Sequence, residues 1–216
     1  MNNATMRTAY HEALDATRLN VVRLGALAGD AIRSAVTALE RHDAELAARV
    51  IAGDDAIDEL RRKVEAASIE LLWRQQPMAG ELRAVAAMLE IGTDLERIGD
   101  YAVSIAKNAI KLTDVALRPA SVEIGLIASI AQSMLEQTMR AYAEGDVDLA
   151  EAVIQRDDDV DRLYHRGIEA LQEEMQADPA IVKAGTLMLF VLTTLERVGD
   201  RAQNIAWHTK EMIGAE

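Results

Sequence analysis

The apolar residues of this chain recur at intervals of three and four over long stretches, which is the spacing of one face of an α-helix. Both of the clearest series contain alanine at several levels, as is typical of closely approaching, nearly antiparallel helices. The first series is Leu14, Thr17, Val21, Leu24, Ala28, Ala31, Ala35 and Ala38, and the second is Ile91, Leu95, Ile98, Ala102, Ile105, Ala109 and Leu112.

Turn-forming residues divide these periodic stretches. The pairs His42-Asp43 and Gly145-Asp146 supply two breaks, and each aspartate is placed to cap the helix that follows it. Connections this short make consecutive helices pack antiparallel. All three prolines also lie between periodic stretches, at Pro77, Pro119 and Pro179. We therefore predict an all-α fold with six long helices over residues 7–41, 43–74, 78–113, 120–144, 146–176 and 180–213.

The second half of the sequence repeats the first. The segment TLERVGDRAQNIA at 194–206 matches DLERIGDYAVSIA at 94–106, with an offset of 100 residues. Residues 43–60 match residues 146–163 at half of their positions, with an offset of 103. The three-residue difference is expected in the turns near Pro77 and Pro179, where it leaves the helix phase unchanged. We predict two pseudo-symmetric three-helix bundles.

The boundary between the two bundles is expected in the segment from Leu112 to Pro119, which links the third and fourth predicted helices. This divides the chain into a first bundle over residues 1–115 and a second over residues 116–216.

Each repeat carries two pairs of acidic residues that are four positions apart on predicted helices. Like charges at this spacing destabilise a helix by a few tenths of a kcal/mol, and the chain accepts this at matching positions in both halves. Paired carboxylates on one helix face are suited to hard cations, and two adjacent helices could clamp a divalent ion. A lone acidic pair is more often a solvated face, but the duplication makes metal binding an equal alternative. The pairs are Asp54 with Asp58, Glu96 with Asp100, Asp157 with Asp161, and Glu196 with Asp200.

Composition and charge exclude several classes of function. The net charge of −13 argues against a nucleic-acid partner and against adhesion to anionic lipid. There is no cysteine, so disulfides, thiolate metal sites and cysteine nucleophiles are excluded. No histidine follows a glutamate by three residues, so the signature of ferritin-like di-iron bundles is missing. No nucleotide-binding loop or Ser/His/Asp arrangement is present, and we expect no enzymatic activity.

The chain is expected to be cytoplasmic, without direct insertion into a membrane. The amino terminus, MNNATMRTAYHEALD, carries early charges and has no apolar core, so we expect no signal peptide. The longest uncharged runs, Ile124 to Leu135 and Ala184 to Leu195, are shorter than the ~20 residues that a transmembrane helix needs.

The tandem motifs LERIGDYAVSIA and LERVGDRAQNIA, each preceded by an acidic D-x-x-[IV]-D-x-L segment, resemble the PhoU family of phosphate-signalling regulators. The resemblance covers essentially the whole chain. It implies two symmetric three-helix bundles, a cytoplasmic location and no catalysis. It also implies negative regulation of the phosphate-starvation response through the ATPase subunit of the phosphate ABC transporter and a sensor histidine kinase. A homodimer is expected as well.

Some members of that family bind multinuclear iron or other metal clusters on E/D-x-x-x-D motifs, which here correspond to the four acidic pairs. The resemblance therefore implies iron, or another divalent metal such as Mn, Zn or Mg. The chain departs from the N-I-A-E end of the family motif, because Lys107 and Trp207 replace the acidic residue. A cation at position 107 competes with a metal, so the first bundle is expected to be the weaker site. Two functions remain open: a regulatory adaptor, and a metal-binding or metal-buffering bundle without the transporter and kinase.

Overall fold

The chain forms six long α-helices, as predicted. The structure, a computed structural model, describes residues 3–74, 77, 79–113, 115 and 124–214, and these residues contain no strand. The helices are α1 (Asn3–Arg41), α2 (Ala44–Arg74), α3 (Ala79–Thr113), α4 (Ile124–Glu144), α5 (Val147–Ala177) and α6 (Val182–Ile213). The all-α fold class is therefore confirmed.

The start of the last helix differs from the prediction. A 3₁₀ turn, η1 (Pro179–Ile181), precedes α6, whereas the sequence pattern placed the α-helix from residue 180. The Asp178 carboxylate accepts a hydrogen bond from the Ala180 N–H at 2.9 Å, which fixes a tight first turn after the proline. The predicted start of the fourth helix at residue 120 lies outside the described residues.

The turns that precede α2 and α5 have the same geometry in both halves. Asp43 accepts from the Leu46 N–H at 2.8 Å, and Asp146 accepts from the Leu149 N–H at 2.9 Å, so both predicted caps are confirmed. The residue before each cap has a positive φ, 60° at His42 and 70° at Gly145. This left-handed conformation closes the preceding helix.

Replacing His42 with Gly should stabilise the chain by about 0.5–1 kcal/mol, because glycine adopts a positive φ without steric cost. The loss of the His42 Nδ1 contact with the Leu39 carbonyl, at 3.2 Å, reduces the gain. Urea unfolding of the variant measures the change. The reverse exchange at the equivalent turn, Gly145→His, should destabilise by a similar amount. A stabilising Gly145→His would contradict this role of the positive φ.

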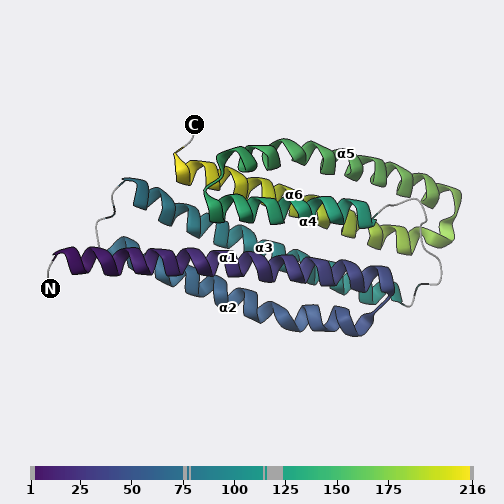
Figure 1. Cartoon of the computed structure of the whole chain (residues 1–216). Coiled ribbons are helices and arrows are strands. Elements are labelled where there is room, and N and C mark those ends of the chain that lie inside the picture. The colour runs from purple at the N-terminus through teal and green to yellow at the C-terminus, as the bar shows by residue number, and fades with distance from the viewer. Residues whose placement is uncertain (1–2, 75–76, 78, 114, 116–123, 215–216) are drawn as a thin grey trace.

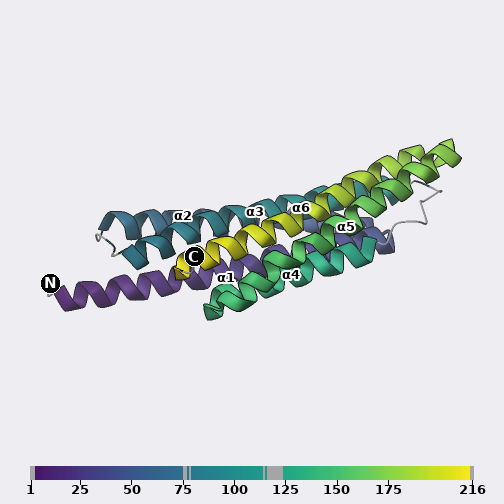
Figure 2. The ribbon, with the colours of Figure 1, turned by 90° about the horizontal axis from the view of Figure 1, so that it is seen from above.

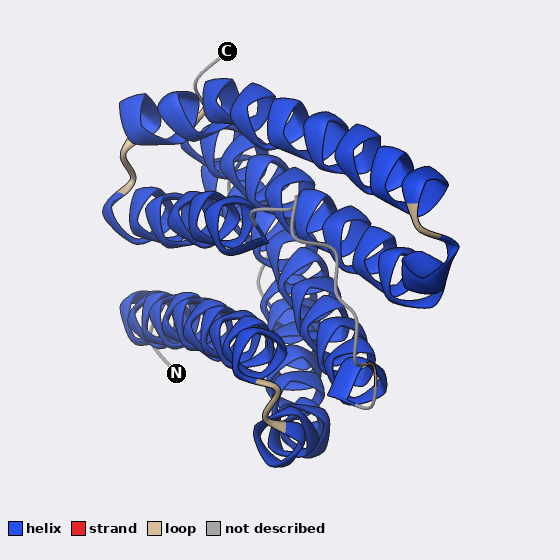
Figure 3. Ribbon diagram, turned by 90° about the vertical axis from the view of Figure 1, so that its right-hand side faces the viewer, coloured by secondary structure: helices blue, strands red, loops and turns tan. Residues whose placement is uncertain are grey.

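The six helices form two groups of three that lie side by side. Helices α1, α2 and α3 form one group and α4, α5 and α6 the other, and consecutive helices run in opposite directions (Figure 1). The groups meet where α3 packs against α6 and α1 packs against α4. The second view shows that all six helices follow one long axis (Figure 2). Figure 3 shows the molecule from its right-hand side, and every regular element of the described residues is a helix.

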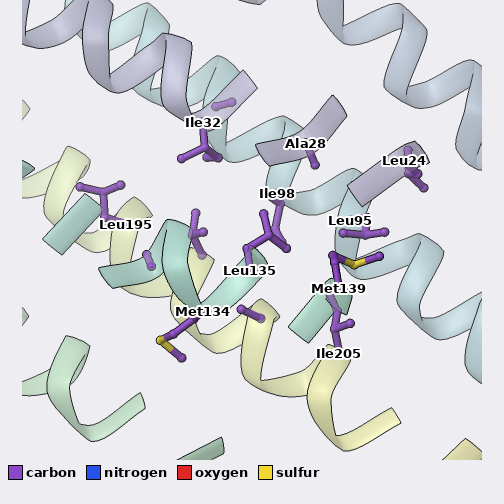
Figure 4. Close-up of a cluster of buried hydrophobic side chains, with 14 of the residues drawn as sticks. Leu24, Ala28, Ile32, Leu95, Ile98, Met134, Leu135, Met139, Leu195 and Ile205 are labelled. Carbon is purple, nitrogen blue, oxygen red and sulfur yellow. The ribbon is translucent and has the colours of Figure 1, made fainter. Parts of the chain in front are cut away.

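One hydrophobic core runs through both groups. Its members include Leu24, Leu95, Leu135 and Leu195, which come from α1, α3, α4 and α6 and belong to one cluster of buried side chains (Figure 4). All positions of the two predicted apolar series are buried except Ala31, which is partly exposed. The bundles therefore share a core. The boundary predicted between residues 115 and 116 falls beside residues 116–123, which lie outside the described part of the chain.

Helix α6 is apolar on several sides because it occupies a central place. By length and composition alone, the segment Pro179–Ile213 is the one candidate for a membrane span among the described residues, with a mean hydropathy of 1.4 in its most apolar window. It packs against α3, α4 and α5. A helix covered from three directions is expected to be apolar over much of its circumference, and 39% of that window is buried inside the fold.

Candidate functional site

A glycine in each repeated motif allows the two acidic helices of each half to approach closely. A methyl group placed on Gly99 of α3 would lie 3.0 Å from Ile57 Cδ1 and 3.5 Å from Asp54 Oδ1, both on α2. The equivalent methyl group on Gly199 of α6 would lie 3.3 Å from Val160 Cγ1 on α5. Glycine therefore lets the helices touch closely at these two positions, and this contact brings the acidic faces together.

In the first half, the two predicted acidic pairs lie near one another. Burial raises the pKa of Asp54, and the charges of Asp100 and Asp58 raise it further. Burial also raises the pKa of Glu96, with the same two carboxylates adding to the effect. Carboxylates on α2 and α3 thus repel each other across the contact at Gly99. The structure brings together all four residues that the sequence singled out in this half.

The equivalent acids of the second half lie in a more strongly perturbed environment. Burial, followed by repulsion from Asp200 and Asp161, raises the pKa of Asp157 to about 6. Asp157 Oδ1 would lie 3.4 Å from a methyl group on Gly199, and this oxygen is buried without a hydrogen-bond partner. Burial also raises the pKa values of Glu196 and Asp200. Arg201 and Arg197 act in the opposite direction on Asp200, so the negative charge at this helix contact is only partly compensated.

The donor chemistry of these clusters fits a hard divalent cation, because carboxylate oxygens are its preferred ligands. The buried, unpartnered Asp157 Oδ1 has the free lone pairs that such an ion would use. The side chains are not in a closed coordination geometry: among the described residues, no group of three His, Asp or Glu is arranged to hold a metal ion. Binding therefore requires the carboxylate side chains to change rotamer.

The two halves differ at the position one further helical turn along. In the first half, the positive charge of Lys107 lowers the pKa of Asp54, against the effect of burial. In the second half, the equivalent Trp207 is 46% exposed, and Lys210 Nζ lies 4.8 Å from its ring centroid. Lys210 is itself paired with Glu151 at 2.6 Å. The first cluster thus has a nearby cation of its own chain, whereas the position equivalent to Lys107 is uncharged in the second.

Without metal, the acidic cluster should make the chain more stable as the pH falls. Folding raises the pKa of Asp157 to about 6, so its ionised form is disfavoured in the folded state above that pH. This penalty is relieved as the pH falls through about 6 towards the unfolded value near 4. Thermal unfolding with a chelator should give a higher midpoint at about pH 5.5 than at about pH 7.5, and Asp157→Asn should reduce this difference. If the wild type and the variant show the same difference in unfolding midpoint between these two pH values, Asp157 is not the cause of the pH dependence.

One polar cluster was not anticipated from the sequence. Asp94 on α3 is 6% exposed and accepts a hydrogen bond from Arg201 Nη1 on α6 at 3.0 Å. His208 Nε2 lies 3.8 Å from the same carboxylate. The sequence did contain a signal for this cluster. Asp94 is a charged residue beside the apolar stripe of its helix, whereas the equivalent residue in the other half is the uncharged Thr194. This cluster links the two halves at the contact of α3 with α6.

Comparison with known proteins places the fold and the repeat in one family. The model of the PhoU domain matches the chain twice, over residues 21–109 and 124–208, which confirms the internal duplication. The chain is 36% identical over 208 residues to the phosphate-specific transport system accessory protein PhoU homolog of Clostridium acetobutylicum, covering 96% of this chain and 95% of that protein. It is 36% identical over 199 residues to the homolog of Caulobacter vibrioides, covering 92% and 86%.

Solved structures agree. The crystal structure of PhoU from Pseudomonas aeruginosa matches with a TM-score of 0.92 at 33% identity, covering 95% of this chain and 99% of that one. The phosphate transport system regulatory protein PhoU from Streptococcus pneumoniae matches with a TM-score of 0.87 at 26% identity, covering 94% and 96%. The PhoU domain model matches both halves of the chain, and the duplicated motif and the six-helix fold agree with that match. The chain therefore belongs to the PhoU family.

Proposed function

We propose that this chain is a cytoplasmic accessory protein of a phosphate-specific transport system and restrains both phosphate uptake and the phosphate-starvation response. The observation that carries this proposal is the match of the PhoU domain to both halves, together with relatives of that description along nearly the whole chain. The net charge of −13 favours basic protein surfaces over nucleic acid as partners.

Its mode of action is that of a protein-binding adaptor without catalysis. The expected partners are the ATPase subunit of the phosphate ABC transporter and a sensor histidine kinase, and the expected oligomeric state is a homodimer. An adaptor acts by binding one functional state of a partner more tightly than another. The chain is suited to this role because its long helices share one core and have exposed residues along their outer faces.

Deletion of the gene tests the regulatory role. In phosphate-replete medium, loss of a negative regulator should raise expression of the starvation genes to the level normally seen in phosphate-poor medium. Quantitative measurement of transporter and kinase-dependent transcripts, with a complemented strain as control, gives the result. Unchanged transcripts in a strain without a second family member would reject the proposal.

A second function, metal binding at the acidic clusters, is favoured by the unpartnered Asp157 Oδ1. The ligands in the second half would be Asp157, Asp161, Glu196 and Asp200, and the ion would neutralise their mutual repulsion. The equivalent ligands in the first half would be Asp54, Asp58, Glu96 and Asp100. Iron, Mn, Zn and Mg are all compatible with carboxylate donors to different degrees.

The double variant Glu196→Gln/Asp200→Asn should lose most of the thermal stabilisation that added metal gives to the wild type, because metal stabilises a fold through preferential binding to the native state. The stabilisation should also weaken as the pH falls through about 6, since protons compete for Asp157. The matched change Glu96→Gln/Asp100→Asn should have a smaller effect, because Lys107 competes with metal there. Equal metal-induced shifts in wild type and both variants would remove the metal function and leave the adaptor function intact.

A further inference from the structure

The largest aromatic side chains of this chain lie on its surface. The sequence contains one phenylalanine and two tryptophans, and Trp73, Phe190 and Trp207 are 85%, 59% and 46% exposed. The buried aromatic residues of the core are tyrosines, at Tyr10 and Tyr142. The core therefore closes with aliphatic side chains and tyrosine, and folding does not explain the exposed rings. Aromatic residues are enriched at protein interfaces, where they often carry much of the binding energy.

The exposed Phe190 and Trp207 lie on the same stripe of α6 as the half-buried acidic pair Glu196 and Asp200. At 100° per residue, Phe190, Glu196, Asp200 and Trp207 fall within an arc of about 120°, away from the buried stripe that contains Leu195. The two rings are separated by about 25 Å along the helix axis, with the carboxylates between them. The stripe therefore has an apolar residue near each end and negative charge in its middle.

Helix α5 adds further negative charge to the middle of this stripe. Asp157 lies against Gly199, and Asp161 is near enough to raise the pKa of Glu196. Arg197 offsets part of this charge. The carboxylates of Glu196 and Asp200 on α6 and of Asp157 and Asp161 on α5 thus lie close together, midway between Phe190 and Trp207.

The other half of the molecule shows that the fold does not need these aromatic residues. The repeat equivalents of Phe190 and Trp207 are Glu90 and Lys107, which are also exposed on the same kind of helix. The two halves therefore share an architecture but differ in the chemistry of this surface. The shared architecture therefore does not require an aromatic residue at either of these two positions.

We propose that the stripe defined by Phe190, Glu196, Asp200 and Trp207, with Asp157 and Asp161 beside it, docks a protein segment that carries basic residues between two apolar ones. Complementary charge selects this partner chemistry, since the four carboxylates at the centre outnumber the nearby guanidinium groups of Arg197 and Arg201. A helical segment of about 17 residues would span the two rings. The inference rests on the proposed adaptor function and assigns its partner-binding face.

The internal repeat supplies the variants for a test. Phe190→Glu and Trp207→Lys introduce the residues that the first half tolerates at the equivalent positions, so the fold should be preserved, and circular dichroism and thermal unfolding check this. Binding of the full-length chain to the detergent-solubilised phosphate transporter and to the full-length kinase is measured with a chelator present, which removes any contribution of metal. Each variant should weaken binding to at least one of them by about tenfold or more.

Two further variants test the charge of the stripe and its position on the molecule. Glu196→Gln/Asp200→Asn should weaken binding and reduce its dependence on salt, because screening acts on the charge pairs. Trp73→Gln, which introduces the equivalent of Gln176, removes an exposed ring outside the stripe and should leave binding unchanged.

Wild-type affinity in both Phe190→Glu and Trp207→Lys would overturn this inference while leaving the adaptor function standing. Failure of the wild type to bind either partner would reject the adaptor function itself, and this surface assignment with it. Sedimentation analysis tests whether a second copy of this chain, and not a partner protein, binds to the stripe. If the two variants abolish self-association and leave partner binding unchanged, the stripe is a contact between two copies of the chain and the proposal is wrong.

Discussion

Replacing Arg201 with Met should lower the free energy of unfolding by about 2–4 kcal/mol, because it leaves a buried carboxylate without its partner. Asp94 is 6% exposed, and its hydrogen bond from Arg201 joins α3 to α6. Burial already raises the pKa of Asp94 even with the guanidinium in place. The side chain of Arg201 is 23% exposed, so solvent can partly compensate, and the lower part of the range is expected. Urea unfolding at neutral pH measures the loss.

The repeat provides the control for this prediction. The equivalents of Asp94 and Arg201 in the other half are Thr194 and Tyr101. The double variant Asp94→Thr/Arg201→Tyr removes both charges together, and replacing a buried ion pair by neutral groups of suitable shape is often close to neutral. Its stability should therefore be nearer to the wild type than that of Arg201→Met. If the double variant loses at least as much stability as the single variant, the unpaired charge is not the cause.

Replacing Gly99 with Leu should destabilise the chain by about 1–3 kcal/mol, the range expected for overpacking a tight contact. Even a methyl group at this position would lie 3.0 Å and 3.1 Å from two atoms of Ile57. A leucine must push α2 away from α3, which also separates the two acidic pairs of the first half. The expected result is a lower unfolding midpoint in thermal and urea experiments, with the six-helix fold retained.

Gly53 is the matched control, because it also lies within a helix but has nothing within 4 Å of an added methyl group. Gly53→Leu should stabilise the chain by about 0.5–1 kcal/mol through higher helix propensity. Opposite signs for the two glycine variants would show that helix contact, and not backbone preference, decides the effect at Gly99. Destabilisation by both would show that the helix contact is not the cause.

The sequence by itself determined the local structure and its duplication. Apolar spacing of three and four residues specified long helices, and the aspartates at 43 and 146 marked helix starts, because such signals depend on neighbours within one or two turns. The acidic pairs were also visible, since residues four apart share a helix face. The repeat indicated which residues of the two halves are equivalent. It did so before any contact between helices was known.

Tertiary structure alone decided how the halves join and how charge is distributed between them. The pairing of Asp94 with Arg201 connects residues 107 positions apart, and no local pattern encodes that distance. The raised pKa of Asp157 likewise depends on burial and on the charge of Asp200, which lies on α6. Both effects arise because helix packing removes specific side chains from water, and the cost of burying a charge depends on which groups then surround it. Helix propensity and periodicity do not contain that information.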